Sequence, residues 1–160
     1  MLNLITQTRV LWILFGLFVV ETIGFGIIMR VWDFAIIDEM SDPDKISAHI
    51  GAMSETQRGV HAWMTATLDV AYPLTYGPLF AGLALRAFKP VFAFPAVAVI
   101  PTDLAEGYVQ VMALIGDESL LWLKAYLTPL KLVWFLTAMV IAIAALLFGY
   151  WRRKHAMSAD

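Results

Sequence analysis

The sequence predicts an all-α protein, a polytopic four-helix bundle that lies within a membrane. Hydrophobic residues make up 61% of the 160 residues, charged residues only 15%, and the mean hydropathy is +0.75. Soluble domains are about half apolar, and one of this size leaves roughly a third of its unfolded-chain surface exposed to water. Several apolar stretches also reach the ~20 residues that a helix needs to cross a bilayer. A soluble cytosolic enzyme is therefore excluded.

Four membrane-spanning helices are predicted, at residues of about 10–29, 60–86, 91–115 and 120–150, in a single membrane domain of residues 1–160. The first stretch has the length of the apolar part of a signal peptide. No small-residue cleavage pattern follows it, so we expect it to remain as the first helix.

Residues 30–59 form the one sizeable segment outside the predicted spans, and they contain helix signals. Ser41 and Asp42 followed by Pro43 are typical of a capped helix start, and apolar residues then recur at i, i+4 and i+7. We expect a short helix here, lying on the outer membrane interface. Ser54 and Gln57 form a capping box, which predicts that the second long helix begins before the membrane.

Lysine and arginine residues gather on one side of the predicted membrane domain. Arg9 precedes the first span, Arg86 and Lys89 lie in the second connection, and residues 152–154 are all basic. Because cytoplasmic connections carry an excess of these residues, we expect both termini to be cytoplasmic. The acidic first connection and the third, which contains Asp117, should face outward. This pattern predicts a multi-pass protein of the inner (cytoplasmic) membrane.

Composition also limits the kinds of chemistry expected. The formal net charge of −2 offers no basic surplus for nucleic acid, and the absence of cysteine excludes thiolate sites. The three histidines (His49, His61 and His155) form no Glu-x-x-His or His-x-x-x-His pair, so neither a metal site nor haem is expected. No phosphate-binding glycine loop or Ser-His-Asp arrangement is present. No cofactor is predicted.

Acidic residues within the spans predict a polar layer in the outer third of the bundle. At a rise of about 1.5 Å per residue, Glu21, Asp69 and Asp103 fall at a similar depth. Asp103, Glu106 and Gln110 also share one face of the third span. Charged residues in a membrane normally face the bundle interior or a cavity, so we expect these side chains to point inward.

The second and fourth spans carry matching polar faces. Helical spacing places five polar side chains together on the second: Arg58, Thr65, Asp69, Tyr72 and Tyr76. His61 lies beside that face, and Lys124, Thr128 and Lys131 align on the fourth helix. Lys131 either bends inward toward the acidic residues of the third span or extends outward to water, and the sequence leaves both open.

Acidic residues outnumber basic ones in this layer, which predicts a pocket. The candidate ligand-binding residues are Glu21, Asp69, Tyr72, Tyr76, Asp103, Glu106 and Lys131. The candidate rim residues are Arg58, His61, Thr65, Gln110, Lys124 and Thr128. At least one carboxylate should be neutral or meet a cation from a ligand or another subunit. The alternative is that the layer only sets the register of the helices.

Three segments resemble those of known membrane proteins. Asp69-Val-Ala-Tyr-Pro-Leu-Thr-Tyr-Gly77, Asp103-Leu-Ala-Glu106 and Leu130-Lys131 are similar to patterns in small uncharacterised bacterial four-helix integral membrane proteins. The overall layout is more weakly similar to the EXPERA group, which includes emopamil-binding protein and the sigma-2 receptor. That resemblance implies a membrane cavity in which carboxylates of the type of Asp69 and Asp103 meet amine or sterol-like ligands.

These observations predict a protein that binds or transfers a small amphipathic ligand, either cationic or lipid-like, in a pocket of the outer leaflet. One alternative is an accessory or structural subunit of a larger membrane complex, docked through the acidic layer or through the alanine face of the fourth helix, which comprises Ala138, Ala142 and Ala145. Another is an EXPERA-like membrane isomerase, with Asp103 and Glu106 as its acid and base. The expected partners are the lipid bilayer, a small ligand and a membrane protein, but not nucleic acid.

Overall fold

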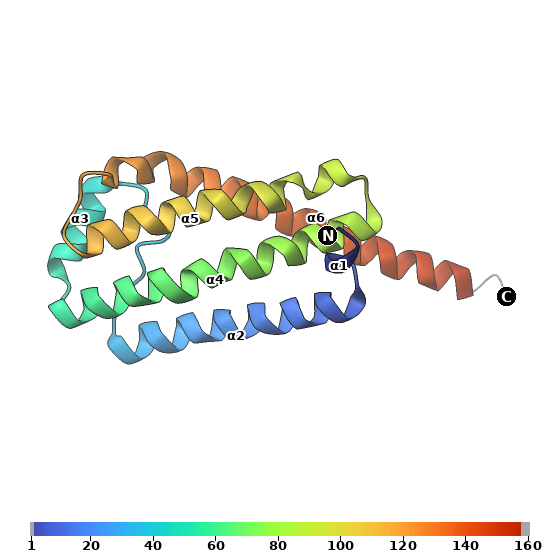
Figure 1. Cartoon of the computed structure of the whole chain (residues 1–160), viewed down its shortest axis with the longest axis horizontal. Helices are drawn as coiled ribbons and strands as arrows, with labels where there is room; N and C mark the ends of the chain where they lie inside the picture. The colour runs from blue at the N-terminus through green and yellow to red at the C-terminus, as the bar shows by residue number, and fades with distance from the viewer. Residues whose placement is uncertain (1, 158–160) are drawn as a thin grey trace.

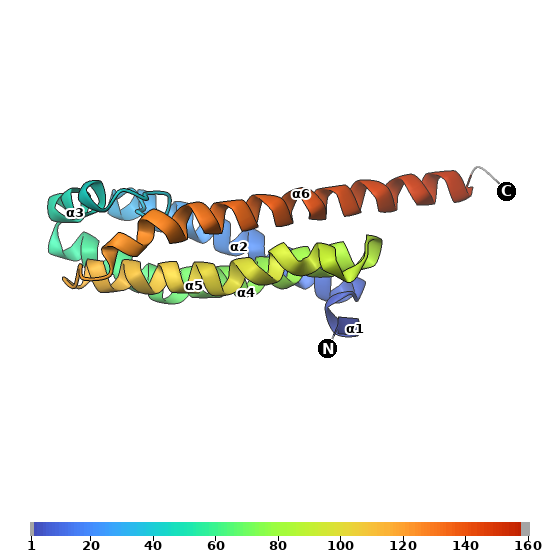
Figure 2. The same ribbon diagram turned by 90° about the horizontal axis from the view of Figure 1, so that it is seen from above.

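The all-helical prediction is confirmed, with 85% of the residues in helices. The computed structural model describes the backbone of residues 2–157 and the side chains of residues 4–152, 154 and 155, and it contains no strand in that part of the chain. Four long helices run side by side (Figures 1 and 2): α2 (Thr8–Trp32), α4 (Glu55–Ala87), α5 (Phe94–Leu114) and α6 (Lys124–Met157). Shorter elements are α1 (Leu2–Ile5), α3 (Pro43–Ala52) and the 3₁₀ turns η1 (Pro90–Ala93) and η2 (Leu121–Leu123).

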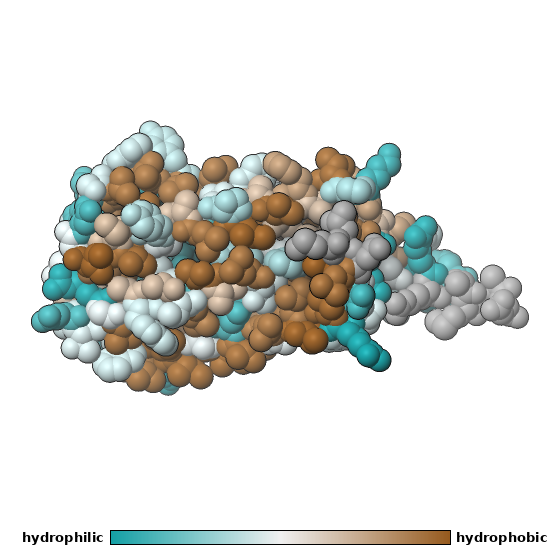
Figure 3. All heavy atoms as spheres, viewed as in Figure 1, coloured by the Kyte–Doolittle hydropathy of each residue, from teal (hydrophilic) through white to brown (hydrophobic). Residues whose placement is uncertain are grey.

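Three helical segments are long and apolar enough to cross a membrane: Thr8–Trp32, Pro90–Leu114 and Leu121–Arg152. The sequence predicts four spans, and α4 is the one that does not reach this hydropathy. It packs against α2, α5 and α6, so much of its surface meets protein and accommodates polar residues. Large apolar side chains are exposed along α2 and α6, and Figure 3 shows apolar residues along the flank between two more hydrophilic ends.

The close packing of α4 against α5 depends on Gly77. A Cβ atom at this position would lie 2.6 Å from Ile100 Cδ1 and 3.1 Å from the carbonyl oxygen of Ala96. Ala138 and Ala142 of α6 are buried in the apolar core that α4 and α5 also form. The alanine face of α6 is therefore used inside this chain.

The predicted caps at both ends of the first connection are present. The Asp42 side chain accepts hydrogen bonds at the start of α3, and Ser54 and Gln57 form the capping box of α4. The Gln57 amide also donates to the carbonyl oxygens of Trp32 and Asp33, at 3.2 and 2.8 Å. One side chain thus links the end of α2 to the start of α4 and holds the two ends of the connection together.

The connection folds against one end of the bundle, and we call residues 33–53 the loop cap. Ile37, Ile46 and Ile50 pack on residues of α5 and η2. Phe34 stacks on the His61 ring at a centroid distance of 4.8 Å. α1 and the last turns of α6 lie toward the other end, where α4 turns into α5 (Figures 1 and 2), and we call this the terminal end.

Candidate functional site

A cavity of about 370 Å³ lies between the helices beneath the loop cap. Residues from every long helix and from the loop cap line it: Thr22, Phe25, Ile36, Asp38, Glu39, His61, Met64, Thr65, Asp69, Tyr72, Tyr76, Asp103, Gln110, Lys131, Leu132 and Phe135. Its wall therefore combines aromatic and aliphatic groups with several ionisable ones, as ligand sites do.

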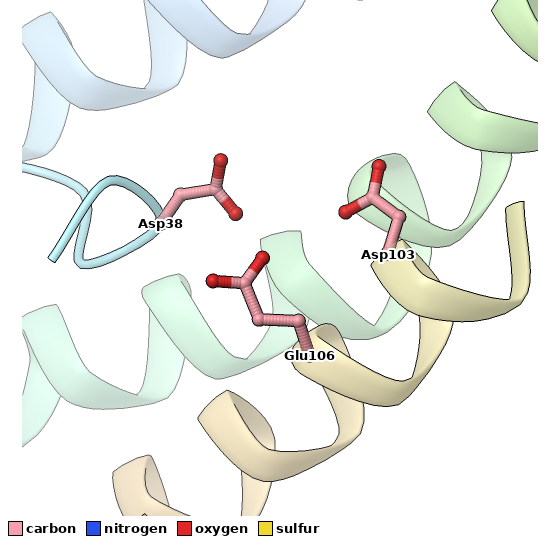
Figure 4. Close-up of side chains that lie close together, drawn as sticks. All are labelled: Asp38, Asp103 and Glu106. Atoms are coloured by element: carbon pink, nitrogen blue, oxygen red, sulfur yellow. The ribbon is translucent and has the colours of Figure 1, made fainter. Parts of the chain in front are cut away.

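Lys131 lies at the centre of an ionic cluster on one side of the cavity. Its Nζ atom is 2.6 Å from Asp38 Oδ1 and 3.5 Å from Asp103 Oδ1, and it also contacts Glu106 Oε2. Figure 4 shows these three acidic side chains converging from the loop cap and α5. The Lys131 side chain therefore points inward, toward these acidic residues, and not outward to water.

The three carboxylates of this cluster lie close enough together to hold a metal ion, with one oxygen from each within 4.8 Å of the others. The ammonium group of Lys131 contacts all three, so the chain itself places a positive charge among them.

A second lysine anchors the loop cap to α5 and α6. The fully buried Lys124 ammonium donates to Glu106 Oε1 at 2.6 Å and to the carbonyl oxygen of Ile37 at 2.9 Å. The Thr128 hydroxyl donates to the same Glu106 oxygen and lies 3.4 Å from the carbonyl oxygen of Met40. Lysine and threonine from one face of α6 thus bind both the buried acid and the backbone of the loop cap.

Neutral donors complete the cluster. The Tyr76 hydroxyl donates to Asp103 Oδ2 at 2.6 Å, and the Gln110 amide donates to Asp38 Oδ1 at 3.0 Å. Burial opposes ionisation of Asp38, but the charge and hydrogen bond of Lys131, the charge of Lys124 and the Gln110 hydrogen bond outweigh it. Together they hold the pKa of Asp38 below its ordinary value.

Asp69 lines the cavity but, unlike Asp38 and Asp103, does not belong to the ionic cluster around Lys131. No hydrogen bond or ion pair to its carboxylate is found among the described residues, although it lines the cavity from α4. His61, another lining residue, has its Nδ1 atom buried without a hydrogen-bond partner in the same part of the chain. The cavity therefore contains two polar groups that the described protein atoms do not satisfy.

The structure brings most of the predicted residues together. Asp69, Tyr72, Tyr76, Asp103 and Lys131 line the cavity, as do the predicted rim residues His61, Thr65 and Gln110. Glu106, Lys124 and Thr128 lie directly behind the wall and bind one another.

Besides the three residues behind the wall, two more predicted residues do not line the cavity. Glu21 is buried between α2 and α4, where Oε1 accepts a hydrogen bond from Thr75 at 3.0 Å and Oε2 has no partner among the described residues. Its neighbour Thr22 lines the cavity instead, because successive residues of a helix point about 100° apart. Arg58, one turn before His61, is also absent from the lining.

Asp38 is the main residue that the sequence analysis missed. It belongs to an acidic connection, and nothing in its local pattern distinguishes it from the neighbouring acids. The one available signal is that Ile36 and Ile37 precede it, since an apolar pair in an otherwise polar segment indicates a buried anchor. The aromatic lining residues Phe25 and Phe135 carry no such signal, because apolar side chains are common throughout the spans.

Asp38 is expected to make the stability of the loop cap dependent on pH. Because its pKa is lowered on folding, its contacts stabilise the protein above the ordinary aspartate pKa of about 3.9, and this contribution is lost as pH falls through the lower folded-state value. Replacing Asp38 with Asn should cost about 1–2 kcal/mol at pH 7 and clearly less at pH 3. Unfolding of both proteins in detergent at the two pH values measures this.

The exposed Glu118, in the connection after α5, provides the control for this experiment. Glu118→Gln should change stability little at either pH, because the side chain lies in water. An Asp38→Asn loss of the same size at both pH values would contradict the ionic role of Asp38.

Comparisons with models of protein families, with curated proteins and with solved structures give no match to this chain.

Proposed function

We propose that this chain is an integral membrane protein that binds a small amphipathic ligand with a cationic group in the cavity beneath the loop cap. The observation that carries the proposal is the Asp69 carboxylate, which faces the cavity with no partner among the described residues. Asp69 is half-buried, and a charge held in a region of low dielectric constant requires a counter-charge or a proton. A ligand cation would supply that counter-charge.

The balance of charges around the cavity supports this proposal. Five acidic residues line it or lie directly behind its wall: Asp38, Glu39, Asp69, Asp103 and Glu106. Lys131 and Lys124 provide two positive charges, and both are already bound to acids other than Asp69. A cationic ligand would therefore meet Asp69 without displacing an existing ion pair.

The remaining walls suit the apolar part of such a ligand. The Phe25 and Tyr72 rings pack edge to face at 5.3 Å, and the Tyr76 and Phe135 rings do so at 5.0 Å. Aromatic faces attract organic cations as well as apolar groups. The volume of about 370 Å³ is at the lower end of the range for small-molecule sites, which favours a ligand smaller than a phospholipid.

The proposed placement has α4 crossing the inner membrane together with the three apolar spans. The other long helices would shield its polar face from lipid. Arg9, Arg86, Lys89 and Arg152 belong to the segments at the terminal end, which supports a cytoplasmic position for both termini. The loop cap would then face outward. The side chain of Arg153, also part of this predicted basic group, lies outside the described residues.

Two observations favour ligand binding over the alternatives. The alanine face of α6, which would serve to dock a partner helix, is buried within this chain. Asp103 and Glu106 both contact Lys131, and Tyr76 also donates to Asp103, so neither carboxylate is free to act as the base of an isomerase. The cavity itself agrees with what the EXPERA resemblance implies, and that relationship remains a proposal.

Octylammonium and octanol test the proposal, because they share an alkyl chain and differ in charge. The native protein in detergent should bind octylammonium more tightly than octanol. Asp69→Asn should lower the affinity for octylammonium about tenfold or more and leave that for octanol unchanged. Native mass spectrometry during titration measures both affinities, and circular dichroism checks that the variant is folded.

Asp44→Asn provides the matched control, since this carboxylate is exposed on α3 and does not line the cavity. It should bind octylammonium like the native protein. A folded Asp69→Asn protein that retains the native preference for octylammonium would overturn the assignment of a cation site to this cavity.

A further inference from the structure

A second pocket lies at the terminal end, between α4 and α6. It has a volume of about 320 Å³ and is lined by Leu83, Arg86 and Ala87 of α4 and by Ala145, Leu146, Phe148, Gly149, Tyr150 and Arg152 of α6. We call it the terminal groove. It shares no lining residue with the cavity beneath the loop cap, so the inference drawn from it does not depend on the proposed function.

Two arginines give the terminal groove a positive charge. Arg86 Nη2 donates to Thr8 Oγ1 at 2.9 Å, which holds its guanidinium group near the start of α2. The Arg152 guanidinium lies 4.9 Å from the centre of the Phe148 ring. Both contacts are to neutral groups, and arginine retains most of its donors for a ligand in such contacts.

Among the described residues, no ion pair between these arginines and an acidic residue is found. No acidic residue lines the terminal groove, none occurs in α4 after Asp69, and none occurs anywhere in α6. The region thus differs from the cavity beneath the loop cap, where acids are in excess. An uncompensated pair of arginines at the edge of an apolar flank is complementary to a phosphate group.

The rest of the groove is apolar. Leu83, Ala145 and Leu146 extend from the arginines toward the centre of the bundle, along the flank where large apolar side chains of α6 are exposed. Tyr150 lies at the charged end and is 70% exposed, as expected of an aromatic residue at a membrane interface. The terminal groove therefore pairs a phosphate-binding end with an apolar wall that fits an acyl chain.

We propose that the terminal groove binds one anionic phospholipid, with its phosphate between Arg86 and Arg152 and an acyl chain along Leu83 and Leu146. Basic pockets between helices recognise anionic headgroups in this way. Free phosphate shares the headgroup chemistry but lacks the acyl chain, so the two sources can be distinguished.

The test uses the full chain in detergent, titrated with phosphatidylglycerol and observed by native mass spectrometry. We expect one molecule to bind more tightly than phosphatidylcholine, and inorganic phosphate at equal concentration not to displace it. The double substitution Arg86→Gln and Arg152→Gln should lower the affinity for phosphatidylglycerol about tenfold or more. The same change at two exposed basic residues near the loop cap, Arg30→Gln and Lys45→Gln, should have no such effect.

Gly149→Phe gives a second variant that keeps both arginines. Gly149 lines the terminal groove, and a Cβ atom placed on it meets no other atom within 4 Å, so a phenyl group can enter the groove without disturbing the packing. This variant should also lose the tightly bound lipid. The proposal is overturned if phosphatidylcholine binds equally well, if phosphate alone displaces the lipid, or if Gly149→Phe binds phosphatidylglycerol like the native protein.

Discussion

Replacing Lys131 with methionine is expected to destabilise the protein by about 3–5 kcal/mol, the loss typical of a buried ion pair that loses one partner. The Lys131 ammonium contacts Asp38, Asp103 and Glu106, so its removal leaves three acidic groups close together with their main counter-charge gone. Methionine preserves most of the side-chain volume, and the expected loss is therefore one of charge. Denaturant unfolding followed by circular dichroism measures the change.

Lys45→Met is the matched control, because it removes the same group from an exposed ion pair. Lys45 lies 3.5 Å from Asp42, and the two side chains are 78% and 47% exposed. Exposed pairs contribute little, so the loss should stay below about 1 kcal/mol. Equal losses for the two lysine variants would show that the buried cluster does not depend on its ammonium group.

Ile37→Ala is expected to detach the loop cap, with a loss of about 2–5 kcal/mol for removing a fully buried isoleucine side chain. Ile37 packs beside Ile46 against α5 and η2, and its carbonyl oxygen accepts a hydrogen bond from Lys124. Weaker packing here should free Asp38 as well, because it is the next residue along the chain. Limited trypsin digestion provides a local measurement, since Lys45 lies on α3 within the loop cap and should be cleaved faster in the variant.

Ile27→Ala makes the same substitution on the outward surface of α2, where the side chain is 58% exposed. Its stability should fall by less than about 1 kcal/mol, and cleavage at Lys45 should be unchanged. If Ile37→Ala left both stability and cleavage at native values, the loop cap would not be anchored as the structure indicates.

Anchoring of the loop cap matters for the cavity, because the loop cap forms part of its wall. Ile36, Asp38 and Glu39 line the cavity, and Asp38 shares Lys131 with the acids of α5. Any ligand that enters from this end must therefore pass or displace residues that are tied to α6 by an ion pair. Asp38→Asn removes the ion pair between the loop cap and Lys131, and Ile37→Ala removes apolar packing of the loop cap on α5 and η2.

The sequence by itself determined the helical class, the approximate positions of the helices and the polar faces of α4, α5 and α6. These features depend on residues that are close together in the sequence. The capping box joins Ser54 to Gln57, three residues later, and helical periodicity places Asp103, Glu106 and Gln110 on one face. Composition likewise predicted apolar spans, although the polar residues of α4 keep that helix below the hydropathy of the other three.

Only the tertiary structure decided which of these faces meet and what lies between them. Lys131 and Asp38 are 93 residues apart, and their contact depends on the path of the loop cap into the bundle, for which no periodic pattern exists. Glu21 and Asp69 have similar predicted depths, yet the rotation of α2 turns Glu21 toward Thr75 and away from the cavity. Depth along a helix follows from counting residues, whereas rotation and loop path follow from packing, which brings together residues that are distant in the sequence.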